Sequence, residues 1–115
     1  MSQEISVRVF DIVGEPLCTA SDDGQLVHDR IAPLLREGKR VALSFAQADT
    51  VISAFLNAAI GQLYGEFKEE EIRERLMVRD MTPEDLVLLK RVVENAKAYF
   101  KDPKRFTQAV GEEGA

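Results

Sequence analysis

Residues 41–61 read VALSFAQADTVISAFLNAAIG, an apolar run followed by a polar break and a second apolar stretch. Val41, Leu43 and Phe45 alternate along the first run, and this spacing is typical of a β-strand. The alanine after Val41 makes the other face of that strand less polar than the outer face of a surface strand, as in strands buried on both sides. We therefore predict that RVALSF forms an interior strand.

The second apolar stretch has the spacing of a helix. Its apolar residues recur one, four, five and eight positions apart, which describes a wide helical stripe. Because the preceding AQADT has loop character, the helix is predicted to begin between Thr50 and Ala54. The charged run KEEEIRER is predicted to prolong this helix or to bridge to the next element. The stripe consists of Phe55, Leu56, Ala59, Ile60, Leu63, Tyr64 and Phe67.

Upstream of residue 41, two strands and one helix are predicted. Apolar and polar residues alternate from Ile5, and the stretch to Val13 ends at turn-forming residues, which predicts a first strand. Leu17–Ala20 could be a second strand, paired to the first as a hairpin. An apolar helical pattern follows, with Ser21, Asp22 and Asp23 as N-cap candidates and Gly38 as its stop. Pro33 predicts a kink, or an early end near Ala32.

Downstream, LMVRDM is predicted to be a short strand. Thr82 as N-cap and Pro83 at the first helical position start a third helix, which Asp102 and Pro103 are predicted to end. Helices alternating with strands predict an α/β fold with a mixed sheet of about four strands, covered by helices. We assign residues 1–101 to a single domain and expect residues 102–115 to be a partly disordered tail.

Composition limits the function of the chain. Its 115 residues suit one domain, and a formal charge of −5 repels phosphate backbones and anionic membrane surfaces. No apolar run approaches the length of a membrane span, and the N-terminus does not resemble a signal peptide. A single cysteine forms no internal disulfide. We expect a cytoplasmic protein with no nucleic-acid or membrane partner; the residues predict no oligomeric state.

No residue pattern points to catalysis. His28 and Cys18 stand ten residues apart without further metal ligands at a recognisable spacing, so no metal site is predicted. We expect His28 on the exposed side of its helix and Cys18 as a small buried apolar residue. Phosphate-binding loops of the GxxxxGK[ST] or GxGxxG type are missing. The chain is therefore expected to be neither an enzyme nor a cofactor protein.

Small residues form a second stripe on the predicted second helix. Ser53, Asn57 and Gly61 are four positions apart, and Ala54, Ala58 and Gly65 lie beside them. Small side chains allow another backbone to approach closely. Either Ser53 caps the helix and the stripe packs against a helix of the same domain, or the stripe binds a partner protein.

These residues resemble a known family. The strand, break and helix of VALSFAQADTVISAFLNAAIG resemble the signature of STAS domains, the anti-sigma factor antagonist fold, in which a strand leads to D-S-S-G-L at a helix start. The SF…SAFLNAAIGQLYG core, the DG…I…LL helix and MTPEDLVLLKRVVENA are similar to the bacterial STAS-like domain of unknown function. This resemblance extends over nearly the whole chain.

The resemblance implies a regulatory signalling module. In the antagonists, a partner kinase of the GHKL ATPase type phosphorylates the first serine of the motif, which corresponds to Ser53. Here Ile52 stands in place of the antagonists' aspartate, Ala54 in place of the second serine, and Phe55 in place of the glycine. We expect docking on a kinase-like ATPase or another regulator; the alternative is a structural or small-molecule-sensing domain in which Ser53 is only a cap. The expected docking residues are Thr50, Ser53, Ala54, Asn57, Ala58 and Gly61.

Overall fold

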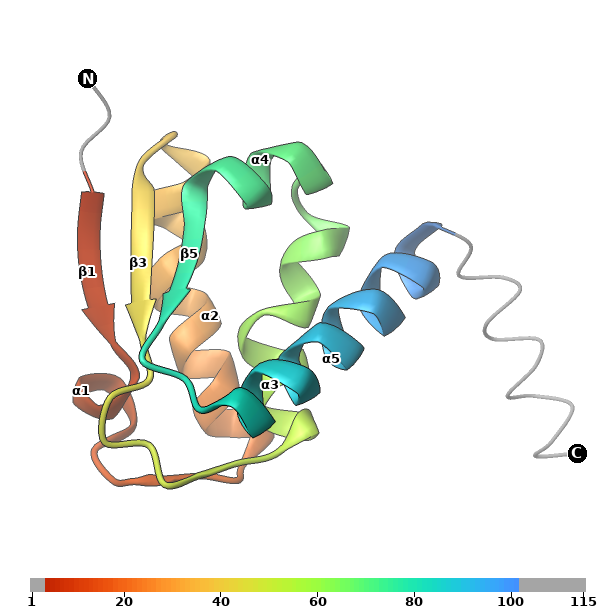
Figure 1. Ribbon diagram of the computed structural model, residues 1–115. Coiled ribbons are helices and arrows are strands. Elements are labelled where there is room, and N and C mark those ends of the chain that lie inside the picture. Colours follow the sequence, from red (N-terminus) through yellow and green to blue (C-terminus); the bar gives the residue numbers. More distant parts are fainter. Residues whose placement is uncertain (1–3, 102–115) are drawn as a thin grey trace, which may run out of the picture.

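Strands and helices are interspersed along residues 4–101, the part of the chain that the computed structural model describes (Figure 1). None of the helices in this part is long and apolar enough to cross a membrane. The expected end of the last helix at Asp102 and Pro103, and the expected tail, lie outside the described residues. The elements are β1 (Glu4–Arg8), α1 (Val9–Val13), β2 (Leu17–Cys18), α2 (Ser21–Arg36), β3 (Arg40–Ser44), β4 (Thr50–Val51), α3 (Ser53–Ala59), the 3-10 helix η1 (Gly61–Gly65), α4 (Glu69–Arg75), β5 (Leu76–Arg79) and α5 (Pro83–Lys101).

The main sheet has three parallel strands in the order β1-β3-β5. β3 is the middle strand, so the predicted interior position of RVALSF is confirmed. The predicted mixed sheet of about four strands is wrong, because β2 and β4 form a separate two-stranded parallel sheet. Helices connect β1 to β3 and β3 to β5, and such crossover connections make neighbouring strands parallel.

The first predicted strand ends early. β1 stops at Arg8, and Val9–Val13 turns into the short helix α1 instead of continuing as a strand. Gly14 ends this helix with a φ of 83°, and its N–H donates to the carbonyl of Phe10. Glycine adopts this left-handed conformation without steric cost. The next segment is not the second strand of a hairpin, since β2 pairs with β4.

Helix α2 spans the predicted segment and ends just before Gly38, but its start differs from the prediction. It starts at Ser21 and runs through Pro33 to Arg36, so the proline does not end it early. Its N-cap residue is Ala20 and no side chain caps it, in contrast to the expected capping by polar residues. Backbone N–H groups of the following turn bond to the last carbonyls of the helix, including that of Pro33.

The predicted second helix is interrupted. Its first seven residues form α3, Gly61–Gly65 forms η1, and Glu69–Arg75 forms the separate helix α4. Ile60 leaves helical geometry with a φ of −121°. Two glycines bound the 3-10 segment, and glycine is a poor helix former. The apolar stripe nevertheless stays in the core, where Phe55, Leu56 and Leu63 are fully buried.

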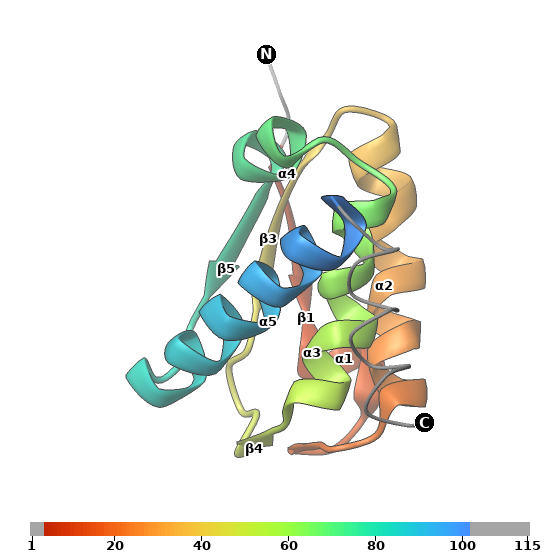
Figure 2. The same ribbon diagram turned by 90° about the vertical axis from the view of Figure 1, so that its right-hand side faces the viewer.

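α5 begins as predicted, with Pro83 as its first residue and the N–H of Asp85 donating to Oγ1 of Thr82 at 3.1 Å. α2, α3 and α5 lie on the same side of the main sheet (Figure 2). α2 and α3 pack closely because Gly24 leaves room for the backbone at Phe55. The core therefore lies between the inward-facing side chains of the strands and these three helices.

Candidate functional site

The small sheet of β2 and β4 leads directly into α3. Leu17 pairs with Thr50 and Cys18 with Val51, and the N–H of Ile52 donates to the carbonyl of Cys18 at 3.2 Å. Side chains alternate along a strand, so Cys18 and Val51 are buried beneath the ladder. The same alternation leaves Leu17 47% and Ile52 36% exposed. An apolar outer surface thus borders the start of α3.

Ser53 is the first residue of α3, within the range predicted for the start of this helix, and it is exposed. Its predicted role as a cap is wrong: Ile52 occupies the N-cap position, and no side chain caps the helix. Within residues 4–101 the Ser53 hydroxyl forms no hydrogen bond with another residue. The hydroxyl is therefore open to solvent and to a partner.

The residues of the small stripe have two different environments, one exposed to solvent and one packed within the domain. Ala54 and Asn57 are exposed beside Ser53, while Ala58 is half-buried near Gly24 of α2. Gly61 is buried against Val92 and Ala96 of α5, so it lies away from the solvent-facing part. Close packing within the domain therefore uses Ala58 and Gly61. We call the remaining exposed surface the Ser53 face; it consists of Leu17, Thr50, Ile52, Ser53, Ala54 and Asn57.

The sequence alone did not indicate two members of this face, Leu17 and Ile52. Leu17 belongs to a strand of only two residues, which is too short to show a period. The only signal that the sequence offered at Ile52 was its replacement of the aspartate found in the antagonist motif. The alternation of buried Val51 and exposed Ile52 after the break could have revealed it.

Acidic residues surround the buried thiol behind this face. The pKa of Cys18 is raised to about 11, mainly by burial and in smaller part by the negative charges of Asp23, Asp85 and Glu15. These three carboxylates come from α2, α5 and the turn before β2. The predicted burial of Cys18 is confirmed, and the three carboxylates act with burial against ionisation of its thiol.

His28 lies in the interior, so its predicted position on the exposed side of the helix is wrong. It is 7% exposed, and its Nε2 is 2.8 Å from Oε1 of Glu66. Its Nδ1 is 3.1 Å from Oδ1 of Asp29, and this hydrogen bond is the main cause that lowers the pKa of Asp29. The hydrogen bond with Glu66 satisfies a polar atom of the buried ring. The pair also links α2 to the residue that follows η1.

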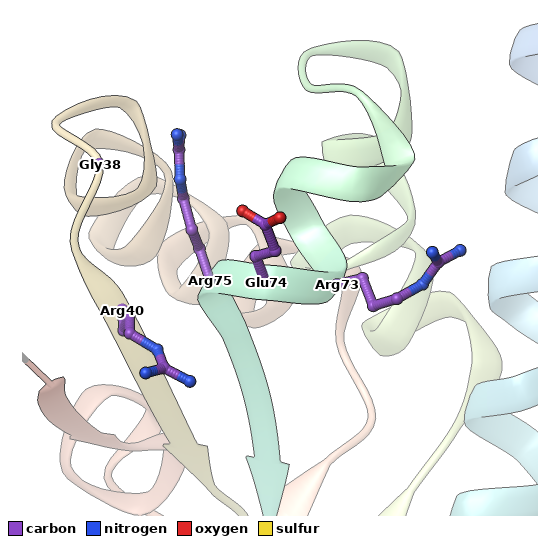
Figure 3. A pocket seen from close by; sticks show the side chains of 5 residues that line it. All are labelled: Gly38, Arg40, Arg73, Glu74 and Arg75. Carbon is purple, nitrogen blue, oxygen red and sulfur yellow. The ribbon is translucent and has the colours of Figure 1, made fainter. Parts of the chain in front are cut away.

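No group of three or more possible metal-ligating side chains gathers within residues 4–101. A hollow of about 530 Å³ lies at the other end of the main sheet, lined by Gly38, Glu74 and three arginines. Figure 3 shows the guanidinium groups of Arg40, Arg73 and Arg75 pointing in different directions, with Glu74 between two of them. Donors that diverge in this way do not form one anion site.

Comparison with known proteins identifies the family. The family model of the STAS-like domain of unknown function matches residues 23–86, more than half of the 115 residues. The matched segment extends from the first turn of α2 to the first turn of α5 and includes the Ser53 end of α3. No curated protein and no solved structure matches the chain. The chain therefore belongs to the family of STAS-like domains of unknown function.

Proposed function

We propose that the domain is a non-enzymatic, cytoplasmic regulatory module that docks on a partner protein through the Ser53 face. The observation that carries this proposal is the exposure of Ile52, which precedes Ser53 and Ala54, and of Leu17, which pairs with Thr50 just before α3. Apolar side chains bordered by small ones allow a partner backbone to approach closely and remove apolar area from water. The similarity to the antagonists supports a kinase-like ATPase or another regulator as the partner.

Phosphorylation of Ser53 is the proposed switch. Its free, exposed hydroxyl is accessible to a kinase, although Ile52 in place of aspartate removes a charged neighbour of the antagonist motif. A phosphate would add about two negative charges to a surface otherwise suited to close contact. Burying such a charge under a partner costs desolvation free energy. Docking should then weaken.

The alternative is a structural or small-molecule-sensing domain in which Ser53 takes no part in binding. The absence of a cap bond removes the helix-capping role from this alternative. The two functions differ in one observable: only docking through the Ser53 face makes affinity for a partner depend on the side chain at position 53.

We expect Ser53→Asp to keep the fold and to lower affinity for a captured and purified partner about tenfold, which is about 1.4 kcal/mol. An acidic side chain at the first residue of a helix does not disfavour the helix. Ser53→Ala should bind like the parent and change the free energy of unfolding by less than about 0.5 kcal/mol, because the hydroxyl has no hydrogen-bond partner among residues 4–101 to lose.

Isothermal titration calorimetry measures the affinity of each variant for the partner, and thermal melts measure its stability. Ala98→Asp is the control, since it adds the same charge at an exposed position of α5 outside the Ser53 face. Equal affinities of Ser53→Asp and the parent would overturn the switch. A loss of affinity in Ala98→Asp as large as that in Ser53→Asp would point to net charge as its cause.

A further inference from the structure

A cleft of about 170 Å³ lies between β5 and the middle of α5. Leu76 and Val78 line it from the strand, and Leu89 and Val93 line it from the helix. All four pack against the core but are only half-buried. Facing apolar side chains in protein interiors normally pack without voids. The strand and helix therefore stand apart and leave an apolar cleft that the described residues, 4–101, do not fill.

Charged side chains border this cleft. Lys97 Nζ and a guanidinium nitrogen of Arg73 each lie 2.8 Å from the same oxygen of Glu69. Two cations thus share one carboxylate, which leaves an excess of one positive charge at the rim. The hydrogen bond from Lys97 is the main cause that lowers the pKa of Glu69. The shift favours the charged form of this carboxylate, and the formal charges of the three groups that line the cleft sum to +1.

Tyr64 joins the apolar and polar parts of the cleft. Its ring lies under the ammonium group of Lys97, with 5.9 Å from Nζ to the ring centroid. Burial raises the pKa of its hydroxyl, so the hydroxyl is a neutral hydrogen-bond donor at neutral pH. An apolar cleft with a few polar groups at one end is typical of small-molecule sites.

We propose that this cleft binds a small carboxylic acid, with its apolar body between β5 and α5 and its carboxylate at Lys97 and Arg73. The cleft's volume is similar to that of cavities that hold benzene, which corresponds to a body of about six carbons. The charge excess at the rim selects an anion over a neutral or cationic ligand of the same size. None of the residues of the Ser53 face lines the cleft, so the site is independent of the proposed docking.

Benzoate is the probe for this site, and benzamide is its neutral counterpart with the same number of heavy atoms. Titrations of the isotope-labelled full chain, followed by amide NMR shifts, should show benzoate binding with shifts centred on Leu76, Val78, Leu89 and Val93. Benzamide should bind about tenfold more weakly, because it lacks the charge. Benzamide affinity equal to that of benzoate, or benzoate shifts centred elsewhere, would overturn the proposal.

Two variants test the parts of the site separately. Lys97→Met keeps most of the apolar stem and removes the charge, and it should weaken benzoate binding about tenfold. Lys90→Met removes a charge from an exposed position of α5 that does not line the cleft, and should bind like the parent. Unchanged binding by Lys97→Met would contradict the assigned role of the rim.

Val93→Phe fills the cleft with a larger side chain and should abolish benzoate binding while the melting temperature stays the same or rises. Leu89→Phe approaches the same space from the preceding turn of α5 and provides a second filling variant if the first does not fold. A folded filling variant that binds benzoate as the parent does would show that the probe binds elsewhere.

Discussion

Replacing Gly24 with alanine is expected to lower the free energy of unfolding by about 3 kcal/mol, because there is no room for a Cβ between α2 and α3. A Cβ built at Gly24 overlaps the carbonyl oxygen of Phe55 and lies 2.9 Å from the Cβ of Ala58. A side-chain rotation cannot relieve a contact with backbone, so the two helices would have to separate. Urea unfolding monitored by circular dichroism measures the change.

Gly61→Ala is the matched control. A Cβ built at Gly61 lies 3.1 Å from Oδ1 of the Asn57 side chain and 3.7 Å from its nearest neighbours on α5. Because the amide side chain can move, this variant should change the free energy of unfolding by about 1 kcal/mol or less. Equal stabilities of the two variants would show that α2 and α3 do not pack as described.

The thiol of Cys18 is expected to react with Ellman's reagent at least about 100-fold more slowly in the folded protein than in the urea-unfolded chain. Two effects combine. The side chain is fully buried, and its pKa is raised from 9.0 to about 11, so the reactive thiolate is scarce at pH 8. The chain has one cysteine, so all the absorbance change comes from this residue.

The same pKa shift predicts a loss of stability in alkali. A raised pKa means that the fold favours the protonated thiol, so the contribution to stability is complete below pH 9 and is lost as the pH rises toward 11. Thermal melts across this range should show the decline, and Cys18→Ala should show a smaller pH dependence.

For the reaction with Ellman's reagent, rapid labelling of the folded protein at pH 8 would contradict the burial of Cys18.

The sequence predicts the parts of the fold that local pattern determines. The alternation around Leu43 identifies the central strand, and Thr82 with Pro83 marks the start of α5. The break after Ile60 was missed because the apolar residues on either side keep helical spacing across it. Gly61 and Gly65 were its only local signals, and tertiary packing decides whether a glycine interrupts a helix.

Local sequence patterns do not show which distant segments of the chain pair with one another. β2 and β4 have two residues each, so nothing in their sequences indicates that Leu17 pairs with Thr50. The burial of His28 depends on Glu66, which lies 38 residues further along the chain. The exposure of Ser53 was predictable because loop residues precede it and apolar residues follow it. The cleft beside β5 was not, because it results from the distance between two elements.

Hydrogen exchange on the complex with a purified partner tests the docking claim most directly. Amide protection is measured along the full chain with and without the partner. Docking through the Ser53 face predicts that protection increases at residues 17–19 and 50–57 and stays unchanged at residues 38–40 and 73–75, at the other end of the sheet. Protection confined to residues 38–40 and 73–75, with residues 50–57 exchanging as in the free protein, would contradict it.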